Sequence, residues 1–197
     1  MFTRQQIQTA VVSKGYAWFD SNKDYDVNIV CIRNNDTQDR LTNRFDDWIT
    51  VSYKINGAWQ CHVWRGTTDP GVTHTRQRLL SPLGVARLVP GQYRGAYEIG
   101  MHQGKYQALV QRRPVTVFRD ANKDAIFDEN KTETGLFGIN IHRSSPTGTS
   151  VQVDGWSAGC MVFANIRDFT VFMGIMRNAQ AVSRRFTLTL IESQDIK

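Results

Sequence analysis

The stretch WITVSYKINGAWQCHVW, residues 48–64, places two runs of β-branched and aromatic residues on either side of Asn56-Gly57. An Asn-Gly pair between such runs is the strongest short-range signal for a β-hairpin, because both residues tolerate the positive φ of a tight turn. Strand-like patterns recur at 27–32, from 85 to 117 and from 186 to 191. Strands at short intervals with few helices predict a mainly β protein of the α+β class.

Two helices are expected beside the strands, one at the N-terminus and one late in the chain. Thr3 and Gln6 have the spacing of a capping box, in which two residues satisfy each other's backbone N–H groups. Asn165 and Asp168 are placed to cap the second helix. Its apolar residues recur at helical spacing, which is typical of a face packed on a core: Ile166, Phe169, Phe172, Met173 and Met176.

The composition predicts one monomeric domain covering 1–197. Of its 197 residues, 41% are hydrophobic and 11% aromatic, which is enough for an ordinary core. Its apolar runs fall short of the ~20 residues that span a bilayer, and the N-terminus carries no apolar signal-peptide core. The sequence therefore predicts synthesis in the cytoplasm and no membrane span.

The net charge and the number of cysteines indicate which partners and which oxidation state of the thiols to expect. The formal net charge of +6 suits an anionic partner such as a wall polymer, and it equally suits solubility. The arginines are scattered and accompany no nucleotide-binding motif, so no nucleic-acid partner is expected. Cys31, Cys61 and Cys160 are an odd number without close pairing, which predicts reduced thiols. Cys31 and Cys61 lie in strand-like runs, where thiols are usually inert.

Cys160 differs from the other cysteines because it follows Ser157-Ala158-Gly159. Small residues let a substrate approach and leave backbone N–H groups free for an oxyanion. His142 lies eighteen positions earlier, and its ordinary pKa near neutrality suits it to take the thiol proton. Alone, each would indicate a buried thiol or a core histidine. Together they indicate nucleophilic catalysis by Cys160, with His142 as general base and acid.

This arrangement resembles the catalytic domain of the L,D-transpeptidase (YkuD-type) family. The family's signature is a His, a spacer, then Ser/Thr-His-Gly-Cys and a hydrophobic residue. Here fourteen residues separate His142 from Ser157, and Met161 follows Cys160. Val89-Pro90-Gly91-Gln92-Tyr93 is similar to an early stretch of the family's core, Thr-Pro-x-Gly-hydrophobic.

The resemblance implies a fold, a site and a substrate. The fold would be a β-sandwich or barrel whose core covers about residues 66–197, with about 1–65 as an N-terminal elaboration. The N–H groups of Gly159 and Cys160 would hold the oxyanion, with Ser157 supporting the site. Such enzymes act on the stem peptides of peptidoglycan and pass the acyl group to an amine or to water.

Two positions depart from the family's pattern: Ala158 replaces the usual His, and Val162 occupies a position where an Arg or Asn is common. Both departures leave the Cys–His pair intact and bear on substrate preference. Arg143 and Ser144 directly follow His142 and are expected at the substrate, with Arg143 binding a stem-peptide carboxylate. A solvent-facing arginine is the alternative.

The expected function is therefore that of a phage-type, endolysin-like cysteine peptidase that hydrolyses peptidoglycan stem-peptide or cross-bridge bonds after release from the cytoplasm. The alternatives are an L,D-transpeptidase that remodels wall cross-links and a non-catalytic virion or wall-binding protein on the same fold. The chemistry requires no cofactor. Zinc catalysis is not favoured, since the four histidines lack a paired ligand spacing.

A second motif, DANKDAIFD at 120–128, has the pattern that begins a Ca²⁺ loop. The expected ligands are oxygen atoms of five residues: Asp120, Asn122, Asp124, Ile126 and Asp128. Ala125 stands where such a loop has Gly, and Lys131 where it has a bidentate Glu. The motif predicts either a structural Ca²⁺ site that braces the segment before His142 or an Asx-rich turn.

Overall fold

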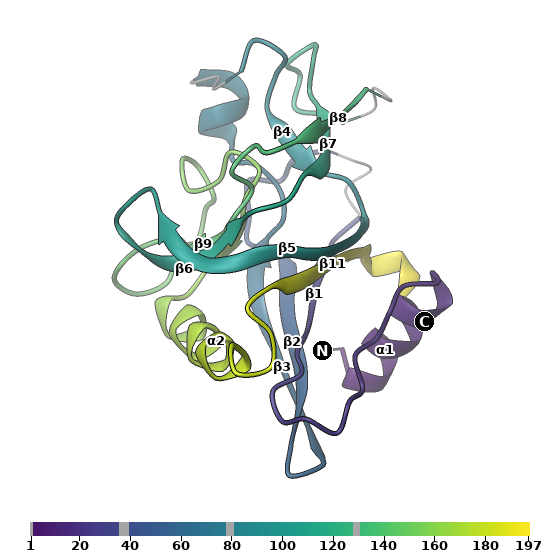
Figure 1. Ribbon diagram of the computed structural model, residues 1–197. Helices are drawn as coiled ribbons and strands as arrows, with labels where there is room; N and C mark the ends of the chain where they lie inside the picture. The colour runs from purple at the N-terminus through teal and green to yellow at the C-terminus, as the bar shows by residue number, and fades with distance from the viewer. Residues whose placement is uncertain (1, 36–39, 78–80, 128–130) are drawn as a thin grey trace.

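Eight strands close into a barrel in the computed structural model, which describes residues 2–35, 40–77, 81–127 and 131–197 (Figure 1). The order around the barrel is β1-β11-β5-β6-β9-β10-β3-β2. These strands are β1 (Asn28–Arg33), β2 (Asp47–Ile55), β3 (Ala58–Thr67), β5 (Gly91–His102), β6 (Tyr106–Gln111), β9 (Ile141–Arg143), β10 (Met161–Phe163) and β11 (Phe186–Glu192). The prediction of a mainly β protein is confirmed.

A second, three-stranded sheet lies above β5 in the view of Figure 1. Its strands, in the order β4-β7-β8, are β4 (Ala86–Leu88), β7 (Val115–Arg119) and β8 (Thr132–Gly135). Leu88 and Val117 are fully buried and belong to the same apolar core as the barrel interior. The two sheets are therefore one packed unit.

The hairpin predicted at Asn56-Gly57 is present. β2 and β3 pair in antiparallel register up to Ile55 opposite Ala58. Both turn residues have positive φ, 51° and 78°, as the tight turn between twisted strands requires. β1, β2 and β3, which come from about the N-terminal third of the chain, are all strands of the barrel.

Two α-helices pack against the barrel, as predicted. α1 (Arg4–Ser13) begins at Thr3 with the capping box to Gln6, and α2 (Ile166–Ala179) begins at the N-cap Asn165. They bury Ile7, Ala10 and Val11 from α1, and Phe169, Phe172, Met173, Ile175, Met176 and Ala179 from α2. Short turns of π-helix and 3₁₀-helix occupy Thr73–Gln77 and Ser193–Asp195. Within the described part of the chain, no helix has the length and apolarity needed to cross a bilayer.

A buried cluster of charged residues joins the three-stranded sheet to the barrel. Arg33 on β1, Asp47 on β2 and Arg87 on β4 are each at most 2% exposed. The Asp69 carboxylate, just after β3, lies 3.1 Å from Arg33 Nε and 2.8 Å from Arg87 Nε. Since β4 belongs to the second sheet, these ion pairs hold that sheet against the barrel.

The parallel pairing of β9 and β10 positions the candidate site. Val162 on β10 is in register with His142 on β9, and Cys160 lies two residues before Val162. Side chains two residues apart on an extended segment point to the same side. Cys160 and His142 therefore reach the same face of the barrel wall.

Candidate active site

Cys160 and His142 line one cavity of about 490 Å³, together with His102, Asn140 and Ala158. Most of its residues come from the end of β5, from β9 and the segment before it, and from the loop before β10, and the others include His74 and Arg119. The volume lies in the range of ligand-binding sites, roughly 300–1,000 Å³. The structure thus brings together the two residues that the sequence singled out for catalysis.

The Cys160 thiol is buried and hydrogen-bonded to the backbone. Its Sγ donates to the Gly138 carbonyl at 3.4 Å and accepts the Asn140 N–H at 3.3 Å. Burial disfavours the thiolate and raises the pKa of Cys160 to about 11, although the Asn140 N–H opposes the shift. At neutral pH the resting group is therefore a thiol, with its hydrogen directed at a carbonyl.

His142 is buried as a neutral ring with one nitrogen available. Burial lowers its pKa to about 3, and the stacked ring of His102, with centroids 4.0 Å apart, acts in the same direction. Its Nδ1 lies 2.8 Å from the Arg143 carbonyl. A carbonyl only accepts, so Nδ1 carries the proton and Nε2 carries the lone pair. The ring is thus held in the tautomer that a general base requires.

Ser157 and Gly159 organise the loop that carries the thiol. The Ser157 hydroxyl donates to the Cys160 carbonyl at 2.9 Å and accepts the Gly159 N–H at 3.1 Å. Gly159 has φ of 120°, and a Cβ there would lie 2.5 Å from the Ala86 carbonyl oxygen. Glycine is thus required by the close approach of β4. Its N–H, expected at the oxyanion, already donates to Ser157, so in this conformation it is not an oxyanion donor.

Arg143 and Ser144 do not line the Cys160 cavity, although they follow His142 directly. The Arg143 guanidinium lies 4.1 Å from the centre of the Tyr106 ring, and one of its nitrogens donates to the Ser144 carbonyl. The Ser144 hydroxyl is buried and donates to the Ala164 carbonyl at 3.1 Å. This arrangement gives no support to their expected contact with a substrate.

His102, Asn140 and Tyr106 also take part in the site, although the sequence analysis did not select them. The Asn140 side-chain amide lies 3.1 Å from His102 Nδ1, and its Oδ1 accepts the Gln111 N–H at 2.9 Å. The Tyr106 hydroxyl donates to the Arg143 carbonyl at 3.3 Å. These groups hold the segment around His142. Polar and apolar residues alternate in Ile139-Asn140-Ile141-His142. This alternation could have indicated that the Asn140 side chain lies on the same side of the strand as His142.

Residues 120–127 of the motif form a tight loop, and Asp128, the last expected ligand, lies outside the described residues. Asp120 is buried and accepts the N–H groups of Asp124 and Ala125 at 3.1 and 3.0 Å. Asp124 Oδ1 accepts the Ile126 N–H at 2.8 Å, and Asn122 Oδ1 accepts the Asp124 N–H. Among the described residues, no group of three or more His, Cys, Asp or Glu is placed to hold a metal ion. These contacts are those of an Asx-rich turn, and calcium binding stays a prediction.

The fold and the site define a mainly β barrel protein with a buried thiol and a neutral imidazole in one cavity. No family model, curated protein or solved structure matches the chain. The resemblance to the L,D-transpeptidases therefore rests on the residues around Cys160 and His142.

Alkylation of Cys160 is expected to be slow at neutral pH and to accelerate as the pH approaches about 11, because the thiolate is the reactive form. Iodoacetamide labelling across a pH series, read by peptide mass spectrometry, measures this rate. Cys61, which is partly exposed, serves as the internal reference and should label first. Rapid labelling of Cys160 near pH 7 would show a resting thiolate–imidazolium pair instead.

Proposed function

We propose that this protein is a cysteine peptidase that hydrolyses stem-peptide or cross-bridge bonds of peptidoglycan through an acyl-enzyme at Cys160. The observation that carries the proposal is the shared cavity of Cys160 and His142, in which the Arg143 carbonyl fixes the histidine tautomer. A nucleophile, a base and a group that orients the base are the parts that such catalysis requires. The alternative of two inert core residues does not account for their exposure to one cavity.

The neutral resting pair defines how the reaction would proceed. As Sγ attacks the substrate carbonyl, the thiol proton moves to Nε2 of His142. The N–H of Asn140, which donates to Sγ at 3.3 Å, stabilises the negative charge on sulfur as the proton leaves. Collapse breaks the peptide bond, and His142 returns the proton to the leaving amine. Water then attacks the thioester with His142 again as base, which releases the acid and regenerates the thiol.

The wall substrate is supported by the resemblance around Gly138 to Phe163 and by the net charge of +6, which suits an anionic wall. Transpeptidation is the second candidate, because Cys160 is only 9% exposed. A site that excludes water lets an amine compete for the acyl group. Ala158 and Val162, which depart from the family's pattern, support a third reading as a wall-binding protein without turnover.

Incubation with defined peptidoglycan, followed by mass spectrometry of the products, tests this proposal. Shortened or uncrosslinked stem peptides that have gained one water identify a hydrolase and name the bond. New cross-links or exchanged terminal residues identify a transpeptidase. An unchanged wall, together with co-sedimentation of the protein, would replace the enzyme with a binding function.

A further inference from the structure

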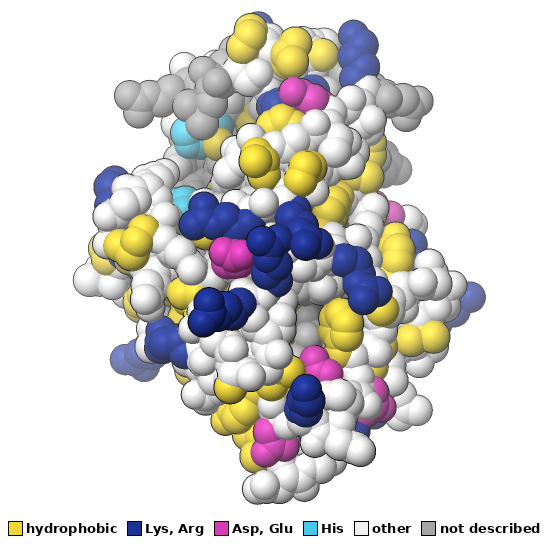
Figure 2. Space-filling view, viewed as in Figure 1, with side chains coloured by type: hydrophobic (Ala, Val, Ile, Leu, Met, Phe, Trp, Pro, Cys, Tyr) yellow, Lys and Arg dark blue, Asp and Glu magenta, His cyan; other side chains and the backbone are white. Residues whose placement is uncertain are grey.

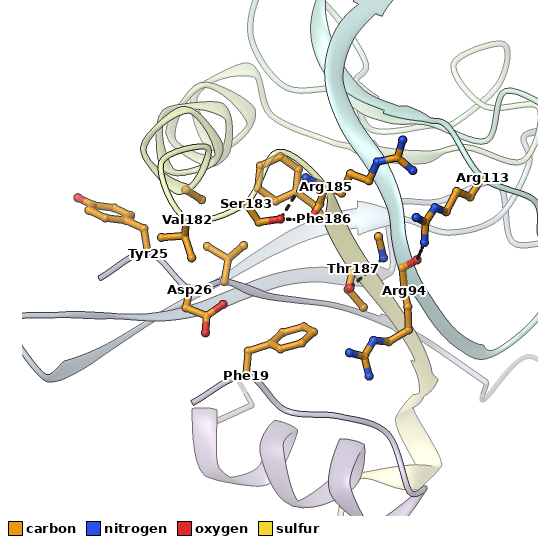
Figure 3. Close-up of a pocket in the computed structure, with 13 residues that line it drawn as sticks. Phe19, Tyr25, Asp26, Arg94, Arg113, Val182, Ser183, Arg185, Phe186 and Thr187 are labelled. Carbon is orange, nitrogen blue, oxygen red and sulfur yellow. Dashed lines mark hydrogen bonds between the residues drawn. The ribbon is translucent and has the colours of Figure 1, made fainter. Parts of the chain in front are cut away.

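A second cavity of about 450 Å³ lies between the end of α2, the start of β11 and the segment before β1 (Figure 3). It shares no lining residue with the Cys160 cavity. Its apolar wall includes Phe19, Val27 and Phe186, of which the last two are buried. It therefore offers a concave apolar surface that the proposed peptidase chemistry does not use.

Three arginines from three separate segments line this cavity. Arg94 lies on β5, Arg113 follows β6, and Arg185 precedes β11. Arg113 Nη1 donates to the Arg94 backbone carbonyl at 3.4 Å, and the Arg94 side chain extends from there toward Phe19 (Figure 3). Figure 2 shows Lys and Arg side chains gathered across the middle of this face, with a single acidic group among them.

Protein carboxylates balance only part of the charge of this cluster. Arg112 and Arg185 share Glu98, whose oxygens lie 3.7 and 3.2 Å from their Nε atoms. In the part of the chain that the structure describes, no carboxylate forms an ion pair with Arg94 or Arg113. A bound anion would neutralise guanidinium charge that these carboxylates leave unpaired. Guanidinium forks also suit phosphate and carboxylate oxygens in bidentate geometry.

The apolar wall lies directly beside the charge. The Arg94 guanidinium is 5.5 Å from the centre of the Phe19 ring, and Figure 3 shows Asp26 on the other side of that ring. The Asp26 carboxylate repels anions, so a bound anionic group would lie at the Arg94 and Arg113 side. The remaining space beside Phe19 and Phe186 takes an apolar body.

We infer that this cavity is a binding site for a small organic anion, in which a phosphate or carboxylate group is joined to an apolar or aromatic body. The anion pairs with Arg94 and Arg113, and the body packs on Phe19. This site is independent of the proposed peptidase activity. A protein that does not cleave the wall could still bind the anion, and a protein that does not bind the anion could still cleave the wall.

Isothermal titration of the full chain with phenyl phosphate, phenylacetate, inorganic phosphate and phenol tests the inference. At least one aromatic anion is expected to bind about tenfold or more tightly than inorganic phosphate or phenol, because only it engages both parts of the cavity. The tighter of phenyl phosphate and phenylacetate names the anion. If neither exceeds inorganic phosphate and phenol, the inference is overturned.

Variants locate the binding. Arg113→Gln and Arg94→Gln, both at exposed side chains, should each weaken binding of that aromatic anion by about tenfold. Arg167→Gln, at the other end of α2, should leave it unchanged. Asp26→Asn should strengthen it, since a repelling charge is removed. Equal losses of affinity in Arg113→Gln and Arg167→Gln, or weaker binding in Asp26→Asn, would show that the anion does not bind in this cavity. Unchanged thermal unfolding is the control that each variant folds.

Discussion

Replacing Cys160 with alanine is expected to lower the rate of stem-peptide cleavage by at least about 10³-fold. The Sγ atom forms the acyl-enzyme in the proposed reaction, and alanine offers no atom that can replace it. The cavity wall is otherwise kept, because Sγ makes only two backbone hydrogen bonds, to Gly138 and Asn140. Release of stem-peptide fragments, measured by quantitative mass spectrometry at saturating wall substrate, gives the rate.

His142→Gln belongs to the same prediction, since the base and the nucleophile act as a unit. Loss of a general base costs about 10²–10⁴-fold, and the double variant should fall no further than Cys160→Ala alone. Cys61→Ala is the matched control, because Cys61 lies on β3 and does not line the cavity. It should keep the wild-type rate. Cleavage that survives in Cys160→Ala would remove this cysteine from the chemistry.

Local signals predicted the local structure correctly. Asn56-Gly57 specifies its turn through the backbone freedom of two residues, and Thr3 with Gln6 forms its cap within one helical turn. The face of α2 follows from the spacing of Phe169 and its apolar neighbours. In each case the determining interactions lie within a few residues of one another, so a single sequence contains them.

Contacts between distant segments could not be predicted. Closure of the barrel pairs β1 with β11, two strands from opposite ends of the chain, and hydrophobic patterning does not specify partners. Asp69 illustrates the same limit. The sequence Asp69-Pro70-Gly71 indicates a turn, whereas the structure buries its carboxylate between arginines from β1 and β4.

The candidate site was predicted only in part, because some of its contacts also join segments that are distant along the chain. The small residues beside Cys160 distinguished it from the other cysteines, and His142 was the histidine at a suitable distance from it along the chain. Sequence could not show that Gly159 is required by the nearby Ala86 carbonyl, because β4 lies far away along the chain. It also could not place His102 against His142, since those rings come from different strands.

Asp69→Asn is expected to lower the free energy of unfolding by about 3–5 kcal/mol, the usual cost of removing one partner from a buried ion pair. Asp69 contacts Arg33 and Arg87, which are at most 2% exposed. Asparagine keeps the shape but leaves two adjacent buried guanidiniums with Asp47 as the remaining carboxylate of the cluster. Chemical denaturation at pH 7 measures the loss.

The pH dependence separates this charge effect from a packing effect. Burial alone would raise the pKa of Asp69, but Arg87 and Arg33 outweigh it and hold that pKa below its ordinary value. The stabilisation is therefore complete above about pH 4, the unfolded value, and is lost as the pH falls through the lower folded value. The difference between wild type and Asp69→Asn should shrink over that acid range. Asp20→Asn, which breaks an exposed pair with Lys54, should cost less than about 1 kcal/mol. A similarly small loss in Asp69→Asn would mean that the carbonyls of Thr68 and Leu88, which accept from Arg33, satisfy the buried charge without Asp69.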